Sequence, residues 1–254
     1  MNPLRIAGAL LFAGSLLAPV AHAASSGPVA ANGYTLTVWA TGTTAYWNPD
    51  DITSAGRHVY VAFQNNTVKD ESAPGSSTVV QFSLAGVPQQ AYPVIGHTDG
   101  LKFDHATSRL WAVSNEDGNP FLTVIQPVNG SEVVYRLSSV DGGGGFDDAV
   151  FTANGAYLSA SNPTLNSDGI NVYPALEQIT LRAGGTAKLV PVFKGNTRVT
   201  DRTTGASVRL NLTDPDSLSV DPTSGNIVLD SQGDSEIVFI QPCSHHPGTH
   251  CKKG

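Results

Sequence analysis

The 254-residue chain carries 14 basic and 21 acidic side chains, a net charge of −7, and no basic stripe that would suit nucleic acid or an anionic membrane surface. Only 14% of its residues are charged, while 26 are glycine and 16 are proline. This composition excludes a protein built from long helices and predicts a turn-rich, all-β fold.

Residues 1–23 have the pattern of a secretory signal peptide. Arg5 precedes an apolar run from Ile6 to Val20, and Ala21-His22-Ala23 fits the small-x-small cleavage rule. The length and alanine content of this segment are typical of bacteria, so we expect an exported protein of the periplasm or the extracellular space. No later stretch reaches the roughly 18 apolar residues of a spanning helix, so no membrane contact is expected after cleavage. The alternative is an uncleaved N-terminal anchor.

The elements predicted after this segment are strands. Gly33–Ala40 alternates apolar and hydroxyl residues and predicts a half-buried strand. A sequence motif then occurs four times: an Asp, a small residue, an apolar run, a turn and a second apolar run ending at Asn or Gln. The lead residues are Asp50, Asp99, Asp148 and Asp216. A repeat of about 50 residues built from short strands predicts a β-propeller of four-stranded blades over residues 24–242.

The strands expected in each blade follow chain order. The first blade contains Val59–Phe63, Thr78–Ser83 and Gln89–Val94, and the second contains Leu101–Phe103, Arg109–Ser114, Leu122–Ile125 and Val133–Leu137. The third contains Ala156–Ala160, Ile170–Tyr173 and Glu177–Arg182, and the fourth contains Ser217–Val220, Asn226–Asp230 and Glu236–Ile240. Phe193–Ser207 lies outside the pattern and predicts a β-hairpin or an excursion on one face.

One repeat carries a family resemblance. Asp99-Gly100-Leu101-Lys102-Phe103-Asp104, followed by Arg109-Leu110-Trp111-Ala112-Val113, resembles the repeat of the gluconolactonase/regucalcin-like six-bladed propellers and the related NHL repeats. Asp216 to Asp230 matches the same pattern, and the likeness extends over residues 34–240. More loosely, the chain resembles exported bacterial propeller proteins without an assigned function. The resemblance implies a divalent metal at the Asp of the Asp-Gly pair, with Asp99 and Asp216 as the matching ligands, and a metal-dependent lactonase-like hydrolase. That family also uses an early Glu ligand, and no Glu occurs here before Glu71, so the ligand set is incomplete.

The number of repeats leaves the closure of the propeller open. Four copies are too few for a six-bladed ring, and the fourth runs directly into the last twelve residues. We expect a shortened chain that lacks about two blades, with a complete four-bladed ring as the alternative. An open arc would expose an unpaired sheet edge, which is an aggregation hazard.

The lead aspartates are the first candidate site residues. Each falls just before the expected innermost strand, so Asp50, Asp99, Asp148 and Asp216 should encircle one mouth of the channel. Hard oxygen ligands grouped there suit Ca²⁺ or another divalent cation. The alternative is that each Asp caps backbone amides of its own strand.

A second set of polar residues follows the second strand of each repeat. Asn65, Asn115, Glu116 and Asn162 should lie on the same rim, where they either bind a ligand or form Asx-turns. His97, just before Asp99, is the one rim histidine with plausible chemistry, although a hydrogen-bonded structural role is the alternative.

The cysteines lie close to the C-terminus. In an exported protein Cys243 and Cys251 predict a local disulfide within a flexible tail, residues 243–254. The three histidines between them make a soft-metal site the alternative, and free thiols are the third possibility.

A repeated polar rim without a complete catalytic set predicts a binding or scaffold protein. We expect a monomer that takes a small molecule or a protein at the channel mouth, with Ca²⁺ or another divalent cation as the one cofactor. A metal-dependent lactonase-like hydrolase is the competing hypothesis, and a truncated inactive propeller fragment is the third.

Overall fold

A computed structural model of the chain describes residues 28–138 and 142–242. The predicted signal peptide and both cysteines lie outside these residues, so the expectations about them stay predictions. The described residues form strands and turns, with one short 3₁₀ turn at Gln232–Asp234. Within the described ranges, no helix has the length and apolar character needed to cross a bilayer.

The chain divides into two compact units, Met1–Val38 and Trp39–Gly254. In the described part of the first unit, residues 28–38, no strand forms, and Tyr34, Leu36 and Val38 are exposed. The predicted strand Gly33–Ala40 was therefore wrong. Alternation is a sufficient signal for a strand only when a partner strand takes up its backbone hydrogen bonds, and these residues belong to no sheet.

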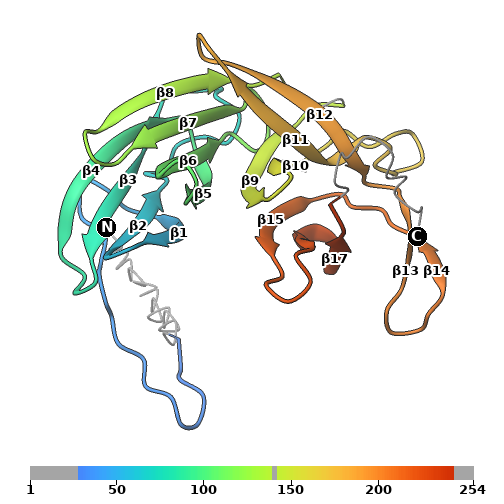
Figure 1. Cartoon of the computed structure of the whole chain (residues 1–254), viewed down its shortest axis with the longest axis horizontal. Helices are drawn as coiled ribbons and strands as arrows, with labels where there is room; N and C mark the ends of the chain where they lie inside the picture. The colour runs from blue at the N-terminus through green and yellow to red at the C-terminus, as the bar shows by residue number, and fades with distance from the viewer. Residues whose placement is uncertain (1–27, 139–141, 243–254) are drawn as a thin grey trace, which may run out of the picture. The chain divides into compact units, whose positions relative to one another are not determined.

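The second unit is an all-β propeller of four antiparallel sheets (Figure 1), each meandering outward from an inner strand. Blade 1 contains β1 Pro49–Ala55, β2 His58–Phe63, β3 Ser76–Ser83 and β4 Pro88–Ile95. Blade 2 contains β5 Thr98–Asp104, β6 Arg109–Ser114, β7 Phe121–Gln126 and β8 Ser131–Arg136. Blade 3 contains β9 Gly145–Thr152, β10 Gly155–Ser161, β11 Pro174–Arg182 and β12 Thr186–Lys194. Blade 4 contains β15 Pro215–Val220, β16 Ile227–Ser231 and β17 Glu236–Ile240.

Most of the predicted strands are confirmed, and two features need comment. Ile170–Tyr173 was predicted as a strand but lies in a loop, because the buried Asn171 anchors it: its Nδ2 donates to the Leu212 carbonyl and its Oδ1 accepts the Tyr173 amide. The expected excursion over Phe193–Ser207 is a hairpin of β13 Arg198–Thr200 and β14 Ser207–Arg209.

Three hydrophobic clusters hold the four blades together, one at each interface between consecutive blades. Blades 1 and 2 share a cluster that includes Tyr60, Tyr92 and Leu110. The clusters between blades 2 and 3 and between blades 3 and 4 include these buried residues: Trp111, Leu122, Phe146 and Leu158 in the former, and Val150, Leu176, Leu218 and Leu229 in the latter. Each inner strand accordingly packs on the next, in the order β1, β5, β9, β15.

No comparable interface joins blade 4 to blade 1 within the described residues. The free face of blade 1 is covered by the segment that precedes it, where the Tyr46 ring packs 4.8 Å from Phe63 and the Trp39 ring 5.5 Å from Phe82, centroid to centroid. On blade 4, by contrast, Ile237 and Phe239 are 66% and 56% exposed. The blades therefore form an array with two different ends.

Candidate functional site

Every inner strand carries a β-bulge close to its first residue. In blade 1, Pro49 faces Phe63 while Ile52 faces Val61, so three steps along β1 match two along β2. The same one-residue excess occurs in β5, β9 and β15. A bulge redirects side chains and increases local twist, which lets two adjacent residues leave the regular in-out alternation.

The bulges bring the lead aspartates into register. The first bulge position holds Asp50, Asp99, Asp147 and Asp216, and the second holds Asp51, Gly100, Asp148 and Ser217. The prediction that Asp148 opens the third repeat was wrong by one residue, since Asp147 takes that position. The lead aspartates also lie inside the inner strands, and not just before them as expected.

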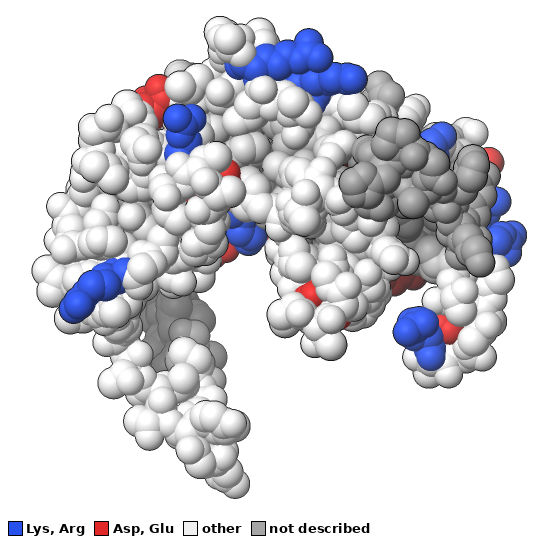
Figure 2. Space-filling view, in the orientation of Figure 1, with Lys and Arg blue, Asp and Glu red and all other residues white. Residues whose placement is uncertain are grey.

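A cavity of about 680 Å³ opens where these bulges meet. Its lining comes from all four blades and includes nine carboxylates: Asp50, Asp51, Asp99, Glu116, Asp117, Asp147, Asp148, Asp214 and Asp216. Lys69 is the one basic residue in the lining. On the molecular face shown in Figure 2, acidic side chains are few and scattered.

The second bulge position fastens neighbouring blades to each other. Asp51 Oδ2 accepts the Leu101 amide of blade 2 at 2.7 Å, and Asp148 Oδ2 accepts the Leu218 amide of blade 4 at 2.8 Å. Between them lies Lys102, whose Nζ is 2.9 Å from Asp148 Oδ2 and 3.3 Å from Asp51 Oδ2. Burial opposes the charge on Lys102, but the two carboxylates outweigh it and raise its pKa.

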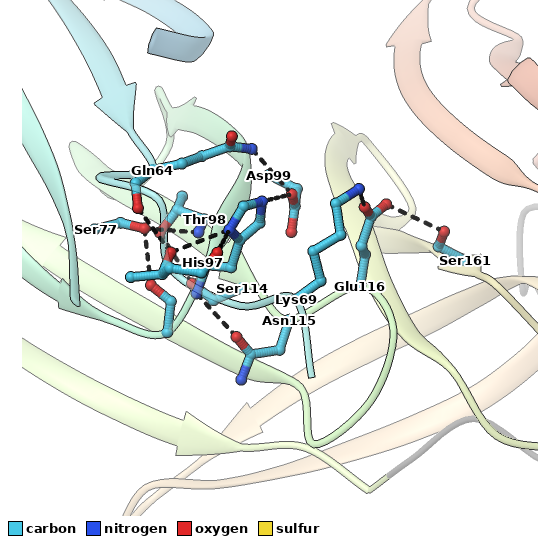
Figure 3. Close-up of polar contacts among 12 residues, drawn as sticks. Gln64, Lys69, Ser77, His97, Thr98, Asp99, Ser114, Asn115, Glu116 and Ser161 are labelled. Carbon is cyan, nitrogen blue, oxygen red and sulfur yellow. Dashed lines mark hydrogen bonds and ion pairs between the residues drawn. The ribbon is translucent and has the colours of Figure 1, made fainter. Parts of the chain in front are cut away.

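Asp99 and His97 form a buried pair at the cavity wall (Figure 3). The His97 Nδ1 lies 2.7 Å from the Thr67 carbonyl and so carries the proton, while its Nε2 lies 3.3 Å from Asp99 Oδ1. Gln64 Nε2 also donates to Asp99 Oδ1. Burial lowers the pKa of His97; burial, with the charges of Glu116 and Asp50, raises the pKa of Asp99 to about 9. Both groups are therefore neutral at pH 7.

Asp99 Oδ2 has no such partner. The residue is 7% exposed, and this oxygen is buried without a hydrogen bond within the described residues. A buried acceptor left unsatisfied costs free energy, and in native proteins it commonly marks a place where a ligand or an ion completes the set.

Glu116 has an ion-pair partner at the cavity wall. Lys69 Nζ binds its Oε1, and the Ser161 hydroxyl lies 3.5 Å from its Oε2 (Figure 3). Although burial opposes the change, hydrogen bonds from Asp147 and Lys69 lower the pKa of Glu116. Burial and the same hydrogen bond raise the pKa of Asp147, which favours a protonated Asp147 that donates a hydrogen bond to Glu116.

The pKa values of three further cavity carboxylates, Asp50, Asp148 and Asp214, are also raised. Burial, with the charges of Asp51, Glu116 and Asp216, raises the pKa of Asp50 to about 6. Burial raises the pKa of Asp148 to about 6 and that of Asp214 in the same direction. Crowded carboxylates with raised pKa values form a site that a cation would stabilise, because the cation takes the place of the bound protons.

The second predicted set divides between structure and cavity. Asn65, Asn115 and Asn162 share a left-handed backbone conformation with φ of 54°, 69° and 46°, which asparagine tolerates better than most residues. Asn65 Nδ2 bonds the Ser76 carbonyl, and Asn115 Oδ1 accepts the His97 amide, so neither reaches the cavity. Asn162 does line the cavity and donates to Asp117 Oδ1.

Several lining residues were missed by sequence reasoning. Asp51 and Asp147 had a signal in the doublets Asp50-Asp51 and Asp147-Asp148, which appear only at bulges. Lys69 and Asp214 had no signal in the sequence, because they lie in long loops outside the repeated motif. Of the two residues implied as metal ligands, Asp99 and Asp216, both line the cavity. No three His, Cys, Asp or Glu side chains in residues 28–138 and 142–242 converge closely enough to hold a metal ion.

No protein-family model matches this chain, and no curated protein is significantly similar to it.

Proposed function

We propose that this protein is a non-enzymatic binding protein whose acidic cavity, at one mouth of the propeller channel, takes a cation. The observation that carries the proposal is the meeting of carboxylates from all four blades in one cavity that contains a single basic side chain. Export to the periplasm or the extracellular space, from the pattern of residues 1–23, belongs to the same proposal.

The polarity of the cavity supports a charged ligand over an apolar one. Ligand pockets are ordinarily apolar with a few polar groups, whereas this one is lined almost wholly by polar and acidic side chains. Desolvated carboxylates in such proximity repel each other unless they are protonated or neutralised. A bound cation removes that repulsion and would bind the native state alone.

The test is thermal unfolding of the purified chain in EDTA and then in an excess of Ca²⁺, Mg²⁺ or an organic amine, at equal ionic strength. At least one cation should raise the melting temperature, because a ligand that binds only the folded state stabilises it. Asp216→Asn should reduce that rise, whereas Glu132→Gln, which removes an exposed charge on β8, should preserve it. If no cation changes the melting temperature of the wild type, the proposal fails.

The lactonase-like hydrolase is the second candidate, favoured by the position of Asp99 in the cavity wall with a buried, unsatisfied oxygen. In that case a divalent metal held by Asp99 and Asp216 would act as a Lewis acid on a lactone carbonyl. Metal-loaded wild type should then hydrolyse lactones and Asp99→Ala should not; a wild type that leaves lactones intact excludes this candidate.

A further inference from the structure

Two ammonium groups of the chain already lie among the carboxylates of this region. Lys102 Nζ, on blade 2, bridges Asp51 of blade 1 and Asp148 of blade 3, and Lys69 Nζ binds Glu116 at the cavity wall. Carboxylates that converge from different blades therefore suit a primary ammonium, which carries three hydrogen-bond donors.

The remaining cavity carboxylates have no such partner. Within the described residues, no Lys or Arg lies within ion-pair distance of Asp50, Asp99, Asp147, Asp214 or Asp216. They enter the cavity from different blades: Asp50 and Asp99 lie on the inner strands β1 and β5 of blades 1 and 2, whereas Asp216 lies on β15 of blade 4 and Asp214 just before it. Among their oxygens, Oδ2 of Asp99 is buried and makes no hydrogen bond within the described residues.

These features fit an organic cation better than a bare metal ion. Ca²⁺ needs about six to eight oxygens at roughly 2.3–2.6 Å, and no three candidate side chains in the described ranges converge in that way. A volume of about 680 Å³ matches the size of small-molecule sites and far exceeds that of an ion. Acidic groups on opposite sides of such a space call for positive charges at two ends of one molecule.

We propose that the cavity binds a linear primary diamine or polyamine, one ammonium held by Asp50 and Asp99 and another by Asp214 and Asp216. The inference rests on the proposed cation-binding function and names the class of cation. The aliphatic chain of the ligand spans the cavity between the two acidic groups.

Isothermal titration of the full chain with 1,4-diaminobutane, 1-aminobutane and CaCl₂ at constant ionic strength tests the proposal. The diamine should bind with one-to-one stoichiometry and at least about tenfold more tightly than the monoamine, because its second ammonium binds intramolecularly. Asp99→Asn and Asp216→Asn should each weaken diamine binding by about tenfold, and Glu132→Gln should leave it unchanged. A thermal melt of each variant in buffer alone shows whether it is folded.

The outcomes separate the two proposals. If Ca²⁺ binds and the diamine does not, the cavity is a cation site and the inferred ligand class is wrong. If neither binds to the folded protein, both proposals fail. If the diamine binds all variants and the wild type equally, or no better than the monoamine, its binding is non-specific and the inference is overturned.

Discussion

Adjacent aspartates at the bulges have different functions. In both doublets the first residue contributes a carboxylate to the cavity, and the second accepts a backbone amide from a neighbouring inner strand. Asp51 and Asp148 are thus structural, although they also line the cavity. Substitutions at the two positions should separate binding from stability.

Gly100 takes the second position in blade 2, where no side chain fits. A Cβ there would lie 2.3 Å from the Asp147 carbonyl oxygen and 2.8 Å from the Asp148 Cα, so β5 and β9 approach each other through this glycine. We expect Gly100→Ala to destabilise the protein by about 1–3 kcal/mol in urea unfolding, as overpacking does. Ser217→Ala, at the same bulge position in blade 4, is the control and should change stability little. If the two variants were equally stable, β5 and β9 could move apart at Gly100 without a loss of folding free energy.

Lys102 neutralises two buried carboxylates at once. Lys102→Met should cost about 3 kcal/mol, because Asp51 and Asp148 would face each other without a counter-charge. Adding Asp148→Asn to Lys102→Met should restore part of that stability, which a double-mutant cycle in urea measures. Additive costs of the two substitutions would contradict the ion-pair argument.

At the scale of strands, the apolar runs were sufficient to predict most of the blades. Arg109–Ser114 and Glu236–Ile240 match β6 and β17, because short apolar runs bounded by turns are a strong signal for strands. The bulges were not predictable. One extra residue changes which strand positions are paired, and the doublet Asp147-Asp148 offers two adjacent candidates for one position, which produced the one-residue error at Asp148.

Part of the site was also predictable at this scale. Four repeats with an Asp at the same point imply a shared rim, and Asp50, Asp99 and Asp216 do lie together. The asparagines repeat for another reason, since the chain needs a left-handed residue after the second strand. A repeated polar residue therefore indicates either a shared site or a shared backbone conformation, and the sequence does not distinguish the two.

Within the described residues, β17 of blade 4 pairs with β16 alone and so leaves one sheet edge open. β17 bonds to β16, and its Ile237 and Phe239 side chains are exposed. Phe239→Lys should reduce self-association in light scattering without lowering the melting temperature, because a charge on an edge strand opposes pairing with another chain. Val128→Lys changes a turn residue that is 91% exposed and should leave self-association unaltered. If both variants self-associate as the wild type does, β17 is not the surface through which the chains associate.

For the molecule as a whole, the raised carboxyl pKa values set the direction of the pH dependence. Asp50 and Asp99 titrate at about 6 and about 9 in the folded protein, against 3.8 in the unfolded chain. Between these values the folded state holds protons that the unfolded chain has released. Stability from these groups is therefore present at low pH and is lost as pH rises through the folded pKa values.

We accordingly expect urea unfolding to show lower stability at pH 9 than at pH 5 in the ligand-free protein. Asp99→Asn removes one of these titrations and should raise the melting temperature at pH 9 by about 3 °C, or roughly 1 kcal/mol for a domain of this size. Glu132→Gln should behave as the wild type does. Stability that increases from pH 5 to pH 9 would contradict the electrostatic account of the cavity.

The three hydrophobic clusters between blades also bear on how the molecule unfolds. Among the described residues, the hydrophobic clusters between blades join only blades that are consecutive in the sequence, so the free energy of folding approaches a sum of local terms along the chain, as in a linear repeat array. In the part of the chain that the structure describes, blade 4 has one neighbouring blade and three strands, so it should be the first to open and to exchange its amide hydrogens with solvent. The amide hydrogens of blades 2 and 3, which have a blade on both sides, should exchange last. The protein would then unfold blade by blade from one end, and not in a single cooperative step.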